Sequence, residues 1–512
     1  MEKMILACDL GTGGNKASLY DSEGNLIEST FVPYETFYPE IGLHEQRPMD
    51  WWDSVLTSIG RLLKKRRGEA ANIGCISFSG HSLGAVPLER DGALLRERTP
   101  IWSDRRPKSQ TKEFFEKMDQ REWYMKTGNG FPPDCYSVFK IMWYRDNEPD
   151  LFKKTHRIVG TKDFINFMLT GNIVTDYSYA SGSGVYDLRG WDYAPQFIEA
   201  SGLSRDLFPK IVPSTAIVGE LKKDVADTLG LPRGVKVVCG GVDNSCMALG
   251  ARNSKDGRVY TSLGTSSWIA VSSNNPVLNA EKRPYVFTHV MPGMFTSAVS
   301  IFSACSSLEW VKDTLFGDLK EAADKKGRDI YEIINELAAE SPIGAHKLLF
   351  NPSLAGGSSQ EGSPHLRGAF SGLDLGHTRG DVLRSAMEGI AMNLGLVLEL
   401  LRKFTKLENE MLMVGGGSKS KLWRQIFADV YDMPVLKTNI GQEAGALGAA
   451  AVGAVGTGIW PDFSRIDDIH KIQDITNPIR ENVEKYNKIR LPFDKLRETQ
   501  TLISDMLHDL DL

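Results

Sequence analysis

Alternating hydrophobic and polar positions at the N-terminus predict short strands separated by turns. Residues 5–7 form an apolar run that leads into a glycine turn, and residues 16–20 alternate before the polar turn at 21–25. Alternation is typical of strands, and glycine-rich turns between alternating runs are typical of hairpins. This stretch therefore predicts strand, turn, strand and turn.

Helical periodicity and further strand patterns alternate along the rest of the chain. The tracts with helical spacing are 49–65, 137–147, 305–315, 330–339, 380–404 and 421–431, and the additional strand candidates are 74–79, 235–239 and 410–414. Apolar residues three and four apart indicate a helix with one buried face. Alternating helices and strands predict an α/β fold.

The first strand, turn, strand pattern returns about half a chain length later. The Leu-Gly-Thr tripeptide at 10–12 has a counterpart at 263–265, flanked by similar strand-like residues. An internal repeat of this length predicts two related lobes, and the polar tract 251–257 suits a linker. The predicted domains are 1–250, 251–460 and a charged, partly helical C-terminal extension at 461–512, packed on the second lobe.

The composition is that of a folded globular protein. Of 512 residues, 41% are hydrophobic and 24% are charged, which is far from the signature of disorder. The formal net charge of −5 offers no basic surface for nucleic acid or an anionic membrane. We therefore expect a small-molecule partner, with no nucleic acid and no membrane.

The cysteines and one uncharged stretch bear on the compartment. The six cysteines are scattered, with no C-x-x-C pair, so they indicate neither a disulfide framework nor a zinc site. Reduced cysteines and the absence of an export signal predict a cytoplasmic protein. Residues 444–461 carry no charge over the length of a minimal membrane helix. They are mostly Gly and Ala, which favours a helix packed closely against other backbone.

One short motif resembles the nucleophile elbow of serine hydrolases. Gly80-His81-Ser82-Leu83-Gly84 is a G-x-S-x-G sequence after a strand-like run. An elbow requires a helix next, whereas this chain continues with a strand-like run into an Asp-Gly turn. The hydrolase interpretation, with Ser82 as nucleophile, therefore lacks its context. No Gly-Lys dipeptide and no H-R-D or D-F-G motif occurs, which excludes P-loop and protein-kinase folds.

The two glycine hairpins together indicate a nucleotide site. They can present backbone amides and the hydroxyls of Thr12, Thr265 and Ser266 to phosphate oxygens. Asp9 suits a hydrated Mg²⁺, which binds few carboxylates and keeps several waters. The glycines at 415–417, between a strand and a helix, allow close approach of a flat ligand such as adenosine.

Asp243 follows another glycine turn after a strand. An acid there can accept a proton from a hydroxyl. It can equally cap a helix over residues 246–251, and the local sequence leaves both interpretations open.

These residues resemble the FGGY family of carbohydrate kinases, up to about residue 460. The motifs that carry the resemblance are 9–12 and 262–266 for the two phosphate loops, 414–418 for the adenosine loop, and a late signature at 368–373, 381–382 and 385–388. An earlier signature is met in part by Ser137, Lys140, Trp143, Asp146 and Asn147. The resemblance implies a two-lobed actin-like, ribonuclease-H-like ATPase fold with duplicated domains and a cleft between them. It also implies ATP and Mg²⁺ as cofactors and a possible homodimer.

The resemblance implies the site residues. Asp243 is the implied catalytic base, and Asp9 is a second catalytic residue and the metal ligand. The implied sugar contacts are His81, Ser82, Leu83, Trp102, Asp104 and Asn244. The implied ATP contacts are Gly11, Thr12, Gly13, Asn15, Lys16, Gly264, Thr265, Ser266, Gly415, Gly416, Gly417 and Ser418.

Within the family the closest likeness is to xylulokinases, with one departure. The motifs that carry this likeness are 45–46 with 51–52, 101–104, 162–164, 240–244 and 262–266. Those kinases typically read Gly-Gln-Met-His-Gly at positions 80–84, so their sugar-contacting Met-His pair falls on Ser82 and Leu83. Loss of a hydrogen-bonding histidine can change substrate preference by orders of magnitude. The Arg-Glu pair of glycerol kinases is also absent, and residues 415–423 resemble the autoinducer-2 kinases. The expected acceptor is a ketopentose, D-xylulose giving D-xylulose 5-phosphate, with ribulose, erythritol or the autoinducer-2 precursor as alternatives.

The expected reaction is Mg-ATP-dependent phosphorylation of a sugar held in the first lobe, with the nucleotide held mainly on the second. Asp243 would accept the hydroxyl proton, and a carboxylate with an ordinary pKa near 4 contributes roughly 10²–10⁴ in rate. The rival from another class is a non-catalytic sugar sensor or nucleotide switch on the same fold. The Asp243-Asn244 pair favours the enzyme, since a sensor needs no proton acceptor.

Overall fold

The structure is a computed structural model that describes residues 3–264, 267–301, 303–358 and 360–510. It divides into two units, and each unit combines segments that are distant in the sequence. The first unit contains the chain up to Asp256, with Ser272–Ser297 and Glu443–His470. The second contains Gly257–Val271, Ala298–Gln442 and the chain from Lys471. These packing units cross the sequence boundaries at 250 and 460, so the predicted domain limits stay a prediction.

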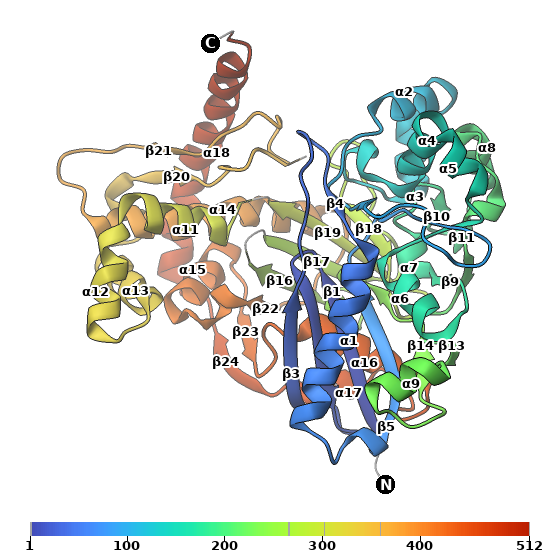
Figure 1. The fold of residues 1–512 in the computed structure, drawn as a ribbon. Helices are drawn as coiled ribbons and strands as arrows, with labels where there is room; N and C mark the ends of the chain where they lie inside the picture. The colour runs from blue at the N-terminus through green and yellow to red at the C-terminus, as the bar shows by residue number, and fades with distance from the viewer. Residues whose placement is uncertain (1–2, 265–266, 302, 359, 511–512) are drawn as a thin grey trace. The chain divides into compact units, whose positions relative to one another are not determined.

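The sheet of the first unit grows from the N-terminal hairpin, which is confirmed (Figure 1). β1 (Met4–Gly11) pairs antiparallel with β2 (Gly14–Tyr20) and parallel with β5 (Ile73–Gly80). The strand order is β13-β14-β5-β1-β2-β3, and β15 also pairs with β5. The other strands are β3 (Leu26–Pro33), β13 (Ile217–Glu220), β14 (Lys236–Val238) and β15 (Gly241–Val242). Because β1, β5 and β15 are parallel, the residues that follow them gather at one sheet edge.

Helices cover this sheet and confirm the interpretation of the Gly/Ala stretch. α1 (Pro48–Lys65) packs on β2 and β3 and crosses in front of the sheet in Figure 1. α16 (Ala444–Gly456) packs on α10 (Asp243–Gly250), β1 and β5. A Cβ on Gly448 would lie 1.9 Å from the carbonyl oxygen of Cys246, so only glycine allows this approach. Throughout the described ranges, no helix combines the length and the apolar character needed to cross a bilayer.

Between β5 and β13 the first unit carries a set of shorter elements. They are β6 (Val86–Leu88), β7 (Thr99–Pro100), α2 (Lys108–Lys117), α3 (Gln120–Thr127), α4 (Ser137–Asn147), α5 (Pro149–Lys154), β8 (Arg157–Val159), α6 (Thr161–Thr170), β9 (Val174–Asp176), α7 (Tyr177–Ala180), β10 (Tyr186–Asp187), β11 (Asp192–Tyr193), α8 (Pro195–Ser201) and β12 (Lys210–Val212). The unit is completed by β4 (Glu45–Gln46), α9 (Lys223–Leu229), β18 (Tyr285–Thr288) and α17 (Arg465–Ile469). Many of these elements bury their aromatic side chains together in one hydrophobic core cluster.

The second unit repeats the pairing scheme of the first, which confirms the repeated strand, turn, strand pattern. β16 (Val259–Leu263) pairs antiparallel with β17 (Ser267–Ser273) and parallel with β22 (Met411–Gly415). β23 (Val435–Thr438) and β24 (Ile472–Thr476) extend this sheet. The strand β24 lies in the C-terminal extension, where only partial helix was expected.

The predicted helices of the second unit are present. They are α11 (Cys305–Trp310), α13 (Ile330–Glu340), α14 (Arg379–Phe404) and α15 (Lys421–Tyr431), beside α12 (Gly317–Lys326) and α18 (Arg480–His508). The tract 305–315 is not one regular helix, since Val311–Leu315 forms a π-helical turn. Further strands are β19 (Phe295–Ile301), β20 (Leu349–Asn351) and β21 (Ala369–Ser371).

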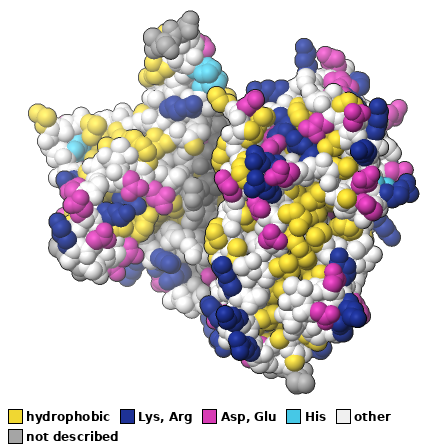
Figure 2. Space-filling view, viewed as in Figure 1, with side chains coloured by type: hydrophobic (Ala, Val, Ile, Leu, Met, Phe, Trp, Pro, Cys, Tyr) yellow, Lys and Arg dark blue, Asp and Glu magenta, His cyan; other side chains and the backbone are white. Residues whose placement is uncertain are grey.

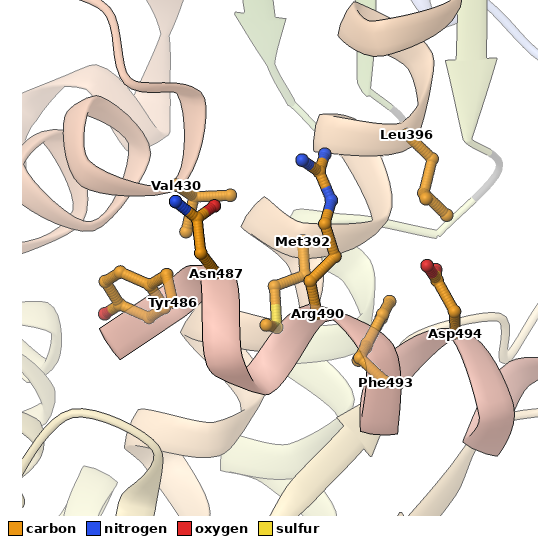
Figure 3. Close-up of a pocket in the computed structure, with 8 residues that line it drawn as sticks. All are labelled: Met392, Leu396, Val430, Tyr486, Asn487, Arg490, Phe493 and Asp494. Atoms are coloured by element: carbon orange, nitrogen blue, oxygen red, sulfur yellow. The ribbon is translucent and has the colours of Figure 1, made fainter. Parts of the chain in front are cut away.

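The late signature and the C-terminal helix support the second unit structurally. Asp381 forms a capping box with Thr378 at the start of α14. Figure 3 shows side chains of α18, among them Tyr486 and Phe493, facing Met392 of α14. The cavity left there has about 10 Å³, enough for one water at most, so it is no ligand site.

Candidate active site

Asp9 lies near the end of β1, in the centre of the sheet edge. Its register partner on β2 is Lys16, and Ser79 Oγ on β5 donates to Asp9 Oδ1 at 2.7 Å. Burial raises the pKa of Asp9, and the Ser79 hydrogen bond and the Lys16 charge counteract part of that rise. The missing side chain of Gly445 leaves room for the carboxylate, since a Cβ there would lie 2.6 Å from Asp9 Oδ2.

Asp243 follows β15 and is the first residue of α10. The cap of this helix is Val242, so the interpretation of Asp243 as a helix cap is wrong. Asn244 donates to Asp243 Oδ1 from its backbone N at 2.8 Å and from Nδ2 at 2.9 Å. Burial, and then the nearby Asp9 charge, raise the pKa of Asp243 to about 7. The expected ordinary pKa near 4 is therefore wrong, and the group suits general base catalysis near neutral pH.

Two side chains, Trp102 and Gln46, donate hydrogen bonds to Thr12 in the β1–β2 turn. The indole Nε1 of Trp102 donates to Thr12 Oγ1 at 2.9 Å, and Gln46 Nε2 donates to the Thr12 carbonyl at 2.7 Å. Since Thr12 Oγ1 accepts a hydrogen bond, its own proton is available to an acceptor such as a phosphate oxygen. Gly13 is exposed and Gly11 is half-buried, as a phosphate-binding turn requires.

Asn15 lies behind this turn. It is fully buried and donates from Nδ2 to Ser58 Oγ on α1 at 2.7 Å. Its side chain therefore packs the hairpin on the helix, and the implied contact with ATP stays a prediction. Lys16 is half-buried.

The 80–84 segment is buried after β5. Burial lowers the pKa of His81 to about 4, and its ring lies 3.2 Å from Thr161 Oγ1 and edge-on to Trp51. Ser82 and Leu83 are also buried, and Leu83 has a positive φ of 60°. β6 follows this segment, so the helix that a hydrolase elbow needs is missing.

Two implied sugar contacts on the next segment differ in accessibility. Trp102 is half-buried, and Phe131, stacked on Tyr285 at 4.0 Å, lies beside it. Asp104 is 0% exposed, and both its oxygens accept hydrogen bonds, from the His44 backbone and from Arg106. Its carboxylate organises the turn, and a sugar contact there stays a prediction. No motif pointed to Phe131 or Tyr285, which only the fold brings together.

The second unit contains a cavity of about 680 Å³ at the predicted adenosine loop. Its lining residues are Leu263, Gly264, Cys305, Leu308, Glu309, Asp329, Tyr331, Glu332, Ile334, Asn335, Met387, Gly416, Gly417, Lys419, Ser420, Trp423 and Gln442. The volume and the mixture of apolar and polar groups suit a nucleoside. Most of these residues lie on predicted helices, but periodicity alone did not show which of their side chains face a cavity.

The glycines of this loop are required by close contacts. Gly415 has a φ of 90°, and a Cβ on it would lie 2.4 Å from the Leu263 carbonyl oxygen. Ser418 is buried and donates from Oγ to the Gly415 carbonyl at 2.7 Å, so its hydroxyl closes the turn. Thr265 and Ser266 lie outside the described residues.

The donor set fits magnesium better than a metal held wholly by protein. Among the residues that the structure describes, no group of three or more His, Cys, Asp or Glu side chains could hold a metal ion. Mg²⁺ commonly uses one or two carboxylates with waters and phosphate oxygens. Asp9 is the carboxylate that the resemblance implies for this role, and its binding of the metal stays a prediction.

Comparisons with known proteins agree with this geometry. The models of the N-terminal and C-terminal domains of the FGGY family of carbohydrate kinases match residues 4–250 and 259–457. The chain is 28% identical to a xylulose kinase of Staphylococcus epidermidis over 509 residues, 99% of each chain. It is 27% identical to a gluconokinase of Bacillus subtilis over 512 residues, 99% of this chain and 98% of the relative. A solved xylulose kinase of Rhodospirillum rubrum superposes with a TM-score of 0.88 at 26% identity, covering 98% of this chain and 100% of that one.

Proposed function

The chain belongs to the FGGY family of carbohydrate kinases, and we propose that within this family it phosphorylates a ketopentose, D-xylulose, to D-xylulose 5-phosphate. The observation that carries the kinase part of the proposal is the position of Asp243 at the start of α10, where Asn244 bonds only one carboxylate oxygen and the pKa is raised to about 7. A group that titrates there is matched to proton transfer at neutral pH. A sensor or switch on this fold would gain nothing from such a base.

Kinases of this family use ATP with Mg²⁺, which when bound supplies the transferable phosphate and neutralises charge on it. The 680 Å³ cavity of the second unit would hold the adenosine, and Asp9 with waters would hold the metal. Thr12 would donate its hydroxyl proton to a phosphate oxygen. Asp243 would accept the proton of the acceptor hydroxyl through the carboxylate oxygen that Asn244 does not bond.

Support for a ketopentose comes from the xylulokinase-like motifs and from relatives named xylulose kinase. A gluconokinase matches almost as well, so gluconate is the principal alternative acceptor. Leu83 replaces the histidine of the xylulokinases and cannot hydrogen-bond a sugar hydroxyl. We therefore expect acceptors to differ most freely at the hydroxyl that this histidine would bind.

The test is sugar-dependent ADP release by the purified protein with Mg-ATP. The acceptors are D-xylulose, L-xylulose, D-ribulose, L-ribulose, erythritol, glycerol, gluconate and the autoinducer-2 precursor. We expect the highest kcat/KM with D-xylulose. A preference for gluconate or a polyol would overturn the ketopentose assignment, and sugar binding without turnover would favour the sensor.

Compartment and assembly follow the same resemblance. All six cysteines are free, which supports the proposed cytoplasmic location. Figure 2 shows Lys, Arg, Asp and Glu side chains on the visible face. We propose a homodimer, to be checked by light scattering.

A further inference from the structure

Three side chains on one face of α4 donate hydrogen bonds to three consecutive backbone carbonyls after β5. The pairs are Ser137 Oγ with Gly84 O at 3.0 Å, Lys140 Nζ with Leu83 O at 2.9 Å, and Tyr144 OH with Ala85 O at 2.9 Å. Positions three and four apart share a helix face. One face of α4 therefore holds the end of the 80–84 segment.

Lys140 also joins this segment to a second one. Its Nζ donates to the Ile101 carbonyl at 2.6 Å, directly before Trp102, whose indole reaches the Thr12 hydroxyl. The lysine is 0% exposed, and a buried ammonium is costly unless its donors are used. Hydrogen bonds from a charged donor are stronger than neutral ones, so one buried charge ties two segments together.

The backbone at Leu83 needs such support. Its φ of 60° lies in the left-handed region, which residues with a side chain rarely adopt and which persists only where the surroundings impose it. The Lys140 bond to the Leu83 carbonyl is one such constraint.

We propose that Lys140 is a positioning residue of the acceptor site, holding residues 82–83 and 101–102 in the arrangement that binds the sugar without contacting the sugar itself. This inference rests on the proposed function, because those residues are the predicted acceptor contacts. Asp9 and Asp243 lie on β1 and α10, and the bonds of the Lys140 ammonium go instead to the Leu83 and Ile101 carbonyls. Loss of the ammonium is therefore expected to raise the KM for the sugar much more than the KM for ATP, which it affects only indirectly through the Trp102–Thr12 hydrogen bond.

The surroundings of Lys140 make its hydrogen bonds to the Leu83 and Ile101 carbonyls sensitive to alkaline pH. The charged and titratable groups that face it are Asp104, Arg106, Asp134, Cys135, His44 and His81. Burial lowers the pKa of Lys140 to about 8, and Asp104 opposes that decrease. The two hydrogen bonds from Lys140 Nζ are therefore expected to weaken as the pH rises through 8 and the ammonium loses its proton.

Steady-state kinetics of Lys140→Met test the proposal. Losing two charge-assisted hydrogen bonds is expected to raise the sugar KM about tenfold or more, with the ATP KM within about twofold. Lys140→Gln, which keeps a neutral donor, should give an intermediate rise. The matched comparison is Tyr144→Phe. Its sugar KM should rise much less than that of Lys140→Met, because the Ala85 carbonyl also accepts from Thr99 Oγ1 at 2.6 Å. A lower kcat with both KM values unchanged would overturn the proposal.

A second measurement does not depend on activity. Amide hydrogen exchange in Lys140→Met should be faster at residues 82–85 and 101–103, and unchanged in β22. Wild-type exchange at both segments would overturn the inference. If the wild-type protein phosphorylates no sugar, the proposed function fails, whereas the exchange result still decides on Lys140. If neither variant folds, the wild-type sugar KM measured from pH 7 to 9 decides: a rise above about pH 8 at constant ATP KM is expected, and a flat profile overturns the proposal.

Discussion

Gly445, in the first turn of α16, leaves the space that the Asp9 carboxylate occupies. A Cβ added there would lie 2.6 Å from Asp9 Oδ2 and 3.1 Å from Cγ, whereas ordinary contact begins at 3.4 Å. Because Cγ is also too close, rotation of the carboxylate does not relieve the clash. Gly445→Ala must therefore displace Asp9 by about 0.8 Å or shift α16.

The expected effect on catalysis is large. Asp9 is the proposed metal ligand, and a misplacement of about 1 Å can cost about 10²-fold in rate. We expect kcat/KM to fall by about 10²-fold and the Mg²⁺ concentration for half-maximal rate to rise. Overpacking should also lower the free energy of unfolding by roughly 1–3 kcal/mol.

The assay is ADP release over a range of Mg²⁺ concentrations, with thermal unfolding to confirm that the variant is folded. The matched control is Gly60→Ala on the exposed face of α1, where an added Cβ meets nothing within 4 Å. Its activity should be unchanged and its stability higher by about 0.5–1 kcal/mol, since alanine favours a helix. A folded Gly445→Ala protein with wild-type rate and Mg²⁺ dependence would refute the placement of Asp9.

Three further predictions concern Asp243 and the contact between α10 and α16. Asp243→Asn should lower kcat by about 10²–10⁴ with little change in either KM; wild-type turnover would remove Asp243 from its role. The base must be ionised, and its pKa is raised to about 7, so kcat/KM should decrease about tenfold per pH unit below pH 7. A constant kcat/KM down to pH 5, measured as ADP release at each pH, would contradict this. Gly448→Ala should lower the melting temperature, since its Cβ would meet the Cys246 carbonyl oxygen at 1.9 Å, and an unchanged calorimetric transition would show that the helices separate freely.

Local sequence pattern was sufficient to predict several elements whose structure depends mainly on neighbours in the chain. The alternation around the first glycine turn predicted the β1–β2 hairpin, and the 3.6-residue period predicted α15 with its observed bounds. The repeated Leu-Gly-Thr tripeptide predicted the second hairpin, which pairs as the first does. Family motifs then placed a nucleotide loop at 415–418, of which Gly416 and Gly417 line a cavity of suitable size.

Packing decided the features that depend on residues far apart in the sequence. The strand β24 pairs with the edge of β23. Residues 472–476 do not show the regular alternation of hydrophobic and polar positions that would have predicted a strand. Asn15 belongs to a phosphate-loop motif, yet α1 supplies its hydrogen-bond partner, so its side chain faces the core.

The chemistry of Asp243 shows the same division. The sequence by itself determined that a carboxylate follows a glycine turn at a strand end, because strand, turn and residue type are local. Only the tertiary structure brought that carboxylate near Asp9 and out of water, which raises its pKa to about 7. Desolvation and charge interactions depend on distances in space, and only folding sets the distances between residues separated by hundreds of positions.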